Sequence, residues 1–326
     1  MASLAAGAGH RIELPPLGLG GAALGGLHGP VSEREGAAAL EAAWSGGIRY
    51  FDTAPLYGSG LGELRFGAFL RAEPRESYVL STKVGWRIRP LERAERPGSL
   101  PFGREVDYTY DGTLRSIEDS LSRLGVESID VALVHDVDPY NHGEEYGRRR
   151  AEVLDGALPA LERLRDQGLV RAVGIAVNNC DVCLDFLEHA RPDLFLLAGR
   201  YSLLDRTAER ALLPACAARG VGIIVGAPFN TGILAKGPAG KFNHGAAPPD
   251  VLARVEAMQK VCAAHGTSLM AAALHFVLRH PVVASVLPGP RSADQVRSLV
   301  AAFGETIPEA LWPDLEALPA DLEPPR

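Results

Sequence analysis

The stretch GIRYFDTAPLYG occupies residues 47–58 and joins the end of an apolar strand to a turn. Its strand ends at Asp52, and Tyr57 follows five residues later. Two further apolar runs end in the same way, YVLSTKVG at Lys83 and DVALVHD at His135. Consecutive strands that each end in a proton-transferring side chain predict a catalytic site at one end of a parallel sheet.

Apolar runs rich in β-branched residues alternate with helical periodicity along the chain, which is the pattern of βα units. After an N-terminal stretch that ends in LPPLGLGGA, we expect strands near residues 48–53, 78–84, 130–135, 170–176, 194–200, 222–227 and 283–287. The N-terminal stretch supplies an eighth strand, and no change in composition marks a linker. We therefore predict an α/β fold, a single (β/α)8 TIM barrel domain over residues 1–326, with its active site at the C-terminal ends of the strands.

Leucine spacing predicts two of the helices. One contains Leu114, Ile117, Leu121 and Leu124. The spacing of Leu158, Leu161, Leu164 and Leu169 suggests the other, which is expected to end near Gly168. A last helix is expected near residues 308–318, before a frayed tail, PADLEPPR. Long connections at residues 86–107, 137–150 and 230–248 predict loops that enclose a substrate.

A hydrophobic content of 47% over 326 residues allows a large buried core. The net charge of −7 gives no general electrostatic reason to bind nucleic acid or an anionic membrane. The first residues lack the regions of a signal peptide, and no run of about 18 apolar residues occurs. We expect a cytoplasmic protein that acts on a small carbonyl or sugar molecule, with no nucleic-acid or membrane partner and a homo-oligomer left open.

The side chains at the strand ends are those that a metal-free carbonyl reductase needs. A free tyrosine is a poor acid at neutral pH because its pKa is about 10. A nearby ammonium stabilises the phenolate, and a carboxylate keeps that ammonium charged and in place. Tyr57 is then the acid and Lys83 tunes it. Asp52 holds Lys83, and His135 donates a hydrogen bond to the reacting oxygen.

Three other features of the sequence are not interpreted as functional sites. GLGGAA at residues 18–23 has the form of a Rossmann phosphate loop, but no helix pattern follows it and no acidic residue lies about 20 positions on. Cys180 and Cys183 form a C-x-x-C without a second such pair, so we expect one cysteine on a buried helix face. The remaining histidines offer no ligand spacing to accompany His135, so no metal site is expected.

Residues 47–58 resemble the strand-two motif of the aldo-keto reductase superfamily, G-x-R-x-F-D-T-A-x-x-Y-G. The resemblance covers nearly the whole chain, through STKVG at 81–85, ALVHD at 132–136, GLVRAVGI at 168–175 and VLPGPRS at 286–292. LLAGRYSLLD at 196–205 and GAPFNTGIL at 226–234 are most similar to the branch with L-fucose and D-threo-aldose 1-dehydrogenases and pyridoxal 4-dehydrogenase. The resemblance implies that His135 orients the substrate carbonyl and contributes to proton transfer.

The resemblance also implies a nicotinamide cofactor. In the family, the end of strand eight holds the adenosine side of NAD(P)H, and here that region contains Gly289, Arg291 and Ser292. Backbone amides at a helix start and a guanidinium can both bind phosphates. Many NADPH-specific members carry an arginine for the 2′-phosphate where this chain has Gln295, so we predict NAD, with NADP left open.

The nicotinamide end departs from the family pattern, in which Ser-Asn, Gln and a stacking Tyr hold the ring. Those places fall here at Ala176 and Val177, Ala198 and Gly226. The usual carboxamide contacts therefore do not transfer to this chain. Asn178, Arg200 and Asn230 are close enough in the sequence to replace them, and Asn178 is the first candidate.

A polar pocket mouth suits a polyol better than an aliphatic aldehyde. The predicted substrate-binding residues are Trp86, Tyr140, Arg200 and Asn230, with an ion pair to Asp205 as the alternative for Arg200. We therefore predict an NAD-dependent dehydrogenase that oxidises the anomeric hydroxyl of an aldose to a lactone. The alternatives are a pyridoxal dehydrogenase, a general aldehyde or ketone reductase, a lyase with Lys83 as a Schiff base, and a non-catalytic cofactor-binding subunit.

Overall fold

The computed structural model describes residues 2–5, 11–27, 29–95, 97, 99–243 and 245–318. One parallel sheet of eight strands organises the fold, in the order β12-β11-β10-β9-β8-β5-β4-β3. Its strands are β3 (Leu19–Gly20), β4 (Tyr50–Asp52), β5 (Val79–Val84), β8 (Ile129–His135), β9 (Val170–Val177), β10 (Leu194–Ala198), β11 (Gly222–Gly226) and β12 (Val283–Leu287). Each lies in a segment for which the sequence predicted a strand.

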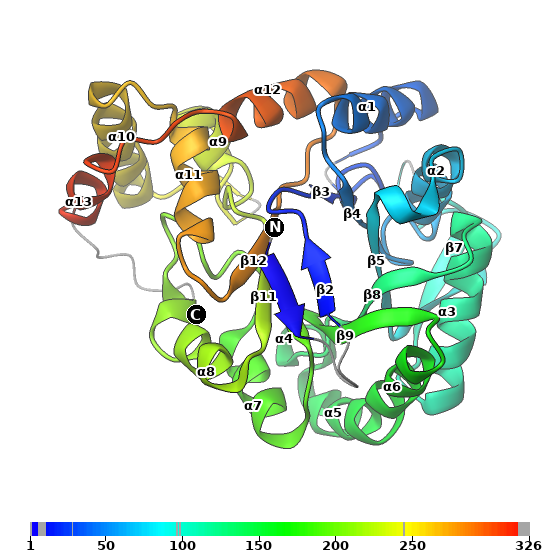
Figure 1. The fold of residues 1–326 in the computed structure, drawn as a ribbon. Helices are drawn as coiled ribbons and strands as arrows, with labels where there is room; N and C mark the ends of the chain where they lie inside the picture. The colour runs from blue at the N-terminus through cyan, green and yellow to red at the C-terminus, as the bar shows by residue number, and fades with distance from the viewer. Residues whose placement is uncertain are drawn as a thin grey trace.

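The sheet closes on itself through its first and last strands. Leu17 pairs with Val286 as a parallel bridge, and the amide of Gly18 donates to the carbonyl of Val286 at 3.0 Å. A side chain at Gly18 has no room, because a Cβ atom there would lie 2.4 Å from Leu287. The predicted (β/α)8 barrel is confirmed, and Figure 1 shows its helices as a ring around the strands.

The principal helices follow the strands in βα order. They are α1 (Glu33–Ser45), α2 (Leu61–Leu70), α3 (Tyr110–Leu124), α6 (Leu158–Asp166), α7 (Cys180–His189), α8 (Leu212–Arg219), α10 (Pro249–Ala264), α11 (Leu269–Leu278), α12 (Ala293–Phe303) and α13 (Leu311–Glu316). The predicted leucine-rich helix is α3, which begins after the N-cap Thr109 and ends at the left-handed Gly125. The last predicted helix is α13, and the tail after residue 318 lies outside the described residues.

Helix α6 ends earlier than the leucine spacing predicted. It stops at Asp166, with Gln167 as its C-cap, and Gly168 adopts a left-handed φ of 78°. The amide of Leu169 donates to the carbonyl of Leu164 at 3.0 Å. Leu169 therefore belongs to the turn into β9 rather than to the helix, because the reversal at Gly168 separates the two elements.

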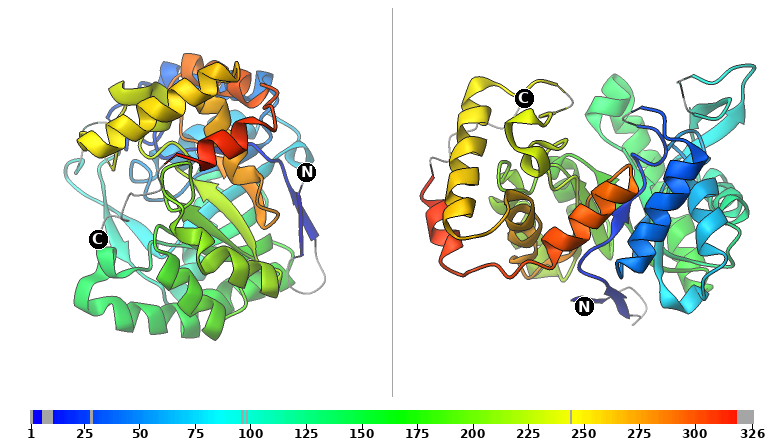
Figure 2. Two further views of the ribbon diagram at one scale, coloured as in Figure 1. Left: turned by 90° about the vertical axis from the view of Figure 1, so that its left-hand side faces the viewer. Right: turned by 90° about the horizontal axis from the view of Figure 1, so that it is seen from above.

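Two short antiparallel sheets lie toward opposite ends of the barrel, as Figure 2 shows. One joins β1 (Ala2–Ala5) to β2 (Arg11–Leu14) near the N-terminal ends of the strands. The other joins β6 (Trp86–Pro90) to β7 (Phe102–Val106) beyond the C-terminal end of β5. The long connection predicted at residues 86–107 is thus a β-ribbon beside the predicted active-site end.

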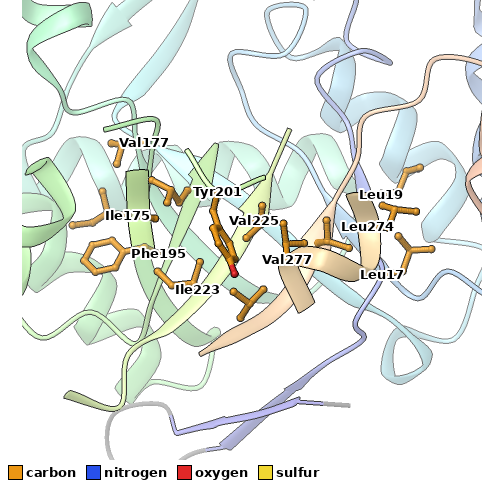
Figure 3. Close-up of a cluster of buried hydrophobic side chains, with 14 of the residues drawn as sticks. Leu17, Leu19, Ile175, Val177, Phe195, Tyr201, Ile223, Val225, Leu274 and Val277 are labelled. Carbon is orange, nitrogen blue, oxygen red and sulfur yellow. The ribbon is translucent and has the colours of Figure 1, made fainter. Parts of the chain in front are cut away.

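Apolar side chains fill two layers, one inside the barrel and one between the barrel and its helices. On β8, Val131 and Leu133 belong to the interior cluster together with Ile12 and Leu14. Ala132 and Val134 of the same strand belong to the outer cluster. Figure 3 shows part of that outer cluster, including residues of β9, β10, β11 and α11. Burial on both faces explains why the strands read as continuous apolar runs.

Over the ranges that the structure describes, no single helix is both long enough and apolar enough to cross a membrane. Helices α10 and α11 together pass that test by length and composition, but they meet at a bend of 93°.

Candidate active site

Asp52 and Lys83 form a buried ion pair at the ends of neighbouring strands. Asp52 is 3% exposed and Lys83 is 1% exposed. The Lys83 ammonium donates to both carboxylate oxygens of Asp52, at 2.9 and 2.7 Å, and to the carbonyl of Thr53 at 2.8 Å. The Ser81 hydroxyl also donates to Asp52, at 2.7 Å. The three bonds that Lys83 donates fix the position of its ammonium group.

Tyr57 lies in the turn after β4 with its ring over this ion pair. The centroid of the Tyr57 ring is 4.7 Å from Nζ of Lys83. It is 5.8 Å from the centroid of the His135 ring, which it meets edge-on at 83°. The fold therefore brings together all four residues that the sequence predicted as catalytic.

The charges around Tyr57 act in opposite directions. Burial raises the pKa of Tyr57 to about 12, against the lowering effect of the Lys83 ammonium. Burial also acts to lower the pKa of Lys83, but Asp52 and Tyr57 outweigh it, and the net pKa of Lys83 is raised. Lys83 therefore stays protonated, as the stabilisation of a phenolate requires.

His135 is the last residue of β8 and is 6% exposed. Burial, followed by the charge of Lys83, holds the pKa of its imidazole well below the ordinary value. The ring is therefore neutral at physiological pH. A neutral imidazole has one N–H and can donate a hydrogen bond to an oxygen without adding a charge to the site.

Three hydrogen bonds fix the peptide group that joins His135 to Asp136. The Tyr108 hydroxyl donates to the His135 carbonyl at 2.7 Å, and the indole N–H of Trp86 donates to it at 3.1 Å. The Asp136 amide donates to the carbonyl of Ala176 on β9 at 2.9 Å. Sequence reasoning missed Tyr108, because no spacing rule links a residue at the end of the β-ribbon to a carbonyl 27 positions later.

Asp136 is a second residue that the sequence did not single out. Its backbone has a left-handed φ of 54°, and its Oδ2 lies 3.6 Å from Nε2 of His135. Burial, and then repulsion from Asp138, raise the pKa of Asp136 to about 7, against the lowering effect of Lys83. A signal was present, because an acidic residue directly follows the histidine at a strand end.

A model of the aldo/keto reductase family matches residues 16–319. The chain belongs to the aldo/keto reductase family. It is 41% identical over 324 residues to a pyridoxal 4-dehydrogenase of Microbacterium luteolum, with 94% of each chain covered. It is 38% identical over 317 residues to a D-threo-aldose 1-dehydrogenase of a Pseudomonas species, with 93% of this chain and 94% of that protein covered. The predicted family is confirmed.

Solved structures show the same fold. The holo form of an aldo-keto reductase from Bacillus halodurans is 24% identical, with a TM-score of 0.74 over 99% of this chain and 98% of that chain. A glycerol dehydrogenase from Gluconobacter oxydans is 22% identical, with a TM-score of 0.75 over 100% of this chain and 98% of that chain. This aldo/keto reductase is thus an oxidoreductase of a family that uses NAD(P)H.

The predicted adenosine side of the cofactor site lies where β12 leads into α12. Gly289 is exposed, and Ser292 caps α12 by accepting a hydrogen bond from the amide of Gln295. The side chain of Gln295 accepts from the amide of Arg291 at 2.9 Å. The Arg291 guanidinium donates to the carbonyl of Pro30 at 2.9 Å, which ties this loop to the segment before α1.

The nicotinamide side is predicted at the ends of β9 to β11. Asn178 directly follows β9 and is exposed, and its carbonyl accepts from Nε of Arg200 at 2.9 Å. Nη1 of Arg200 lies 3.3 Å from Asp205, which is the ion pair foreseen as the alternative for this arginine. Ala198 pairs with Gly226 across β10 and β11, so the positions without the family's polar side chains are adjacent.

The other predicted substrate-binding residues differ in exposure. Trp86 is half-buried, and its ring stacks on that of His142 with centroids 5.6 Å apart. The Tyr140 side chain is 90% exposed. Asn230 is only 4% exposed, and its amide oxygen accepts from the Ser202 hydroxyl at 2.5 Å. Asn230 therefore has a partner in the loop that follows β10, and its contact with a substrate stays a prediction.

The cysteines of this aldo/keto reductase fit the structural interpretation. Cys180 and Cys183 are free thiols at the start of α7, and Cys183 is fully buried. Burial raises the pKa of Cys180 to about 12 and that of Cys183 well above its ordinary value, so neither is a reactive thiolate. Among the residues described, no group of His, Cys, Asp or Glu side chains has the arrangement to bind a metal ion.

Proposed function

We propose that this aldo/keto reductase is an NAD-dependent dehydrogenase that oxidises the anomeric hydroxyl of an aldose to a lactone. The observation that carries the chemistry is the cluster in which Lys83 lies between Asp52 and the ring of Tyr57, beside a neutral His135. The substrate class is supported by the 38% identity to a D-threo-aldose 1-dehydrogenase over most of the chain.

In the oxidising direction, Tyr57 accepts the proton of the substrate hydroxyl as a phenolate. Lys83 stabilises that phenolate, and Asp52 keeps Lys83 charged and fixed. His135 donates its N–H to the same substrate oxygen, which becomes the carbonyl oxygen of the lactone. The hydride leaves the anomeric carbon, and a bound nicotinamide supplies its acceptor. In reduction these proton transfers run in reverse.

The residues around the start of α12 fit the phosphates of such a cofactor. The first amides of a helix have no partner within the helix and point toward an anion. Gly289 leaves space beside them, since a Cβ atom there would meet only the carbonyl of Gly20, at 3.6 Å. At the other end of the site, the Asn178 side chain offers both a donor and an acceptor, as a carboxamide requires.

Oxidation of pyridoxal is the second candidate. It is favoured by the 41% identity to a pyridoxal 4-dehydrogenase over 94% of both chains. Both candidates use the same proton transfer by Tyr57, so the catalytic cluster does not separate them. The residues that line the substrate pocket must determine which of the two substrates is oxidised. Measuring both activities decides between the two candidates.

The contacts of Lys83 argue against a lyase that forms a Schiff base. A Schiff base requires a neutral amine that can attack a carbonyl. Lys83 instead makes three hydrogen bonds as an ammonium, and its pKa is raised. Its nitrogen therefore has no free lone pair for attack.

The test is NADH formation with a panel of aldoses that includes L-fucose, with pyridoxal as the comparison substrate. We expect aldose oxidation by the wild-type protein, and we expect Tyr57→Phe to lower kcat by about two orders of magnitude or more. Circular dichroism and cofactor titration should show that this variant keeps its fold and its binding. A higher kcat/KM for pyridoxal than for every aldose would replace the first candidate by the second, and near wild-type kcat in Tyr57→Phe would remove Tyr57 from the mechanism.

A further inference from the structure

We propose that Asp136 is a specificity residue that binds a hydroxyl group on the substrate carbon next to the reacting carbon. The inference rests on the proposed function in one respect, that His135 donates to the reacting oxygen. The ligand class that it predicts is an α-hydroxy carbonyl compound or the corresponding α-hydroxy alcohol. In an aldose that hydroxyl is the one on C2.

The carboxyl group of Asp136 lies beside the donor nitrogen without being bound by it. Oδ2 is 3.6 Å from Nε2 of His135, which is beyond the range of a hydrogen bond. In the described part of the chain, no other residue donates a hydrogen bond to this carboxyl group. A carboxyl group in the site that lacks a protein donor has its full capacity for a ligand hydroxyl.

The charge of Asp136 also acts on the residues of the catalytic cluster. The charge of Asp136 raises the pKa of Tyr57 and that of Tyr108, each in addition to the larger effect of burial. Lys83 in turn acts on Asp136 and lowers its pKa. The geometry places the carboxyl group beside the imidazole, with Oδ2 3.6 Å from Nε2 of His135, and 32% of the Asp136 side chain is exposed, so a ligand can reach it.

The backbone of Asp136 is fixed in a conformation that directs its side chain. A φ of 54° is left-handed, which residues other than glycine rarely adopt. The Tyr108 hydroxyl, the Trp86 indole and the Ala176 carbonyl all bind the peptide group that precedes the Asp136 Cα. Conformations of this kind persist where the surroundings determine them, and they are concentrated at functional sites.

The distances suit neighbouring hydroxyl groups. A reacting oxygen bound by His135 lies about 2.6–3.2 Å from Nε2. The Asp136 oxygen is 3.6 Å from that same nitrogen. The imidazole and the carboxyl group are therefore close enough to each other to bind two oxygens on adjacent carbons.

The test compares two substrates that differ only in this hydroxyl. Lactaldehyde and propanal are reduced with NADH, or with NADPH if NADH is not accepted, and the ratio of their kcat/KM values is measured. Asp136→Gly removes the carboxyl group and relaxes the left-handed backbone, while Asp136→Asn keeps the shape and removes the charge. We expect wild-type protein to favour lactaldehyde, and the ratio to fall about ten-fold or more in Asp136→Gly and by less in Asp136→Asn.

The matched control is Asp138→Asn, which removes a carboxyl group two residues away. Asp138 accepts from the amide of Asn141 at 2.9 Å and so caps α4 (Pro139–His142). Its loss should change both substrates equally. The inference is overturned if wild-type protein does not favour lactaldehyde, or if Asp136→Gly lowers kcat/KM equally for both aldehydes.

This design separates the inference from the proposed function. If no aldose is oxidised but the preference for lactaldehyde depends on Asp136, the proposed substrate is wrong and the role of Asp136 stands. If aldoses are oxidised, L-fucose and 2-deoxy-L-fucose give the same comparison in the oxidising direction. An equal loss for these two sugars in Asp136→Gly would then overturn the role of Asp136 and leave the proposed function intact.

Discussion

The hydroxyl group of Tyr108 donates a hydrogen bond to the backbone carbonyl of His135, 2.7 Å away in the interior of the protein. The same hydroxyl oxygen lies 3.0 Å from Nε2 of His142. A phenol has a single hydrogen, so when that hydrogen is on the His135 carbonyl, the ring nitrogen of His142 must be the donor to Tyr108. The position of the His135 backbone thus depends on two residues of loops that follow different strands.

This relationship leads to a prediction for Tyr108→Phe. Among the described residues, Trp86 then remains as the only side-chain donor to the His135 carbonyl, and we expect the less firmly held imidazole to lower kcat by about ten-fold. Loss of one buried hydrogen bond should lower the free energy of unfolding by about 1 kcal/mol. Steady-state kinetics and urea denaturation measure the two effects. Tyr110→Phe is the control, because its hydroxyl accepts from the exposed Arg163 within the layer of helices and, in the described part of the chain, makes no hydrogen bond to His135. An unchanged kcat in Tyr108→Phe would show that Tyr108 does not position His135.

Lys83→Met should shift the pH dependence of oxidation upward. Lys83 lowers the pKa of Tyr57, so its removal raises that pKa above the present value of about 12 and makes the phenolate scarcer at any given pH. The measurement is kcat/KM for oxidation from neutral to strongly alkaline pH. Loss of the ammonium also leaves Asp52 buried without its partner, so the variant should unfold more easily.

Asp52→Asn should shift the same profile in the same direction by a smaller amount. The variant has two opposing effects on the pKa of Tyr57. Loss of the Asp52 charge lowers this pKa, whereas a Lys83 that is no longer held in place stabilises the phenolate less and so raises it. If both Lys83→Met and Asp52→Asn keep the profile of the wild-type protein, this pair does not tune Tyr57.

The choice between NAD and NADP should depend on Gln295. An uncharged side chain there does not offset the charge of a 2′-phosphate, so we expect a higher kcat/KM with NAD than with NADP. Gln295→Arg adds a charged, bidentate donor and should narrow the ratio by about ten-fold. Ser298→Arg adds the same charge further along α12 and serves as the control. A preference of the wild-type protein for NADP would contradict this prediction. The contact with the 2′-phosphate would then be assigned to Arg291.

The raised pKa of Asp136 predicts a pH-dependent stability. An aspartate in the unfolded chain has a pKa of about 3.9, and burial with repulsion from Asp138 raises it to about 7 in the folded protein. The folded state binds this proton more tightly, so the contribution of Asp136 to stability is present below about pH 4 and is lost as the pH rises through about 7. Asp136→Asn removes this dependence. Its Tm relative to that of the wild-type protein should therefore increase between about pH 5 and about pH 8.5, and a constant difference would contradict the raised pKa.

Local sequence patterns were sufficient to predict the barrel, and together with the family resemblance they named four residues that the fold brings together. Asp52, Lys83 and His135 each stand at the end of a mainly apolar segment, and such segments are strands buried on both faces. In a closed parallel barrel, the C-terminal ends of all strands lie at one rim. Strand position alone therefore places these residues near one another, although they are far apart in the chain.

The contacts that tune the site were decided only by the tertiary structure. Tyr108 reaches the His135 carbonyl because the β-ribbon of β6 and β7 returns to the end of β8. The left-handed backbone of Asp136 depends on that carbonyl and on the Ala176 carbonyl of β9.

The physical reason is that periodicity reports the local burial of a segment and not the path of its connections. Strand ends are set by local apolar patterns, so Lys83 could be placed from the sequence. The partner of a polar side chain in a loop is set by contacts between segments that are distant in the chain, such as the pairing of Asn230 with Ser202. Those contacts exist only after the barrel has closed.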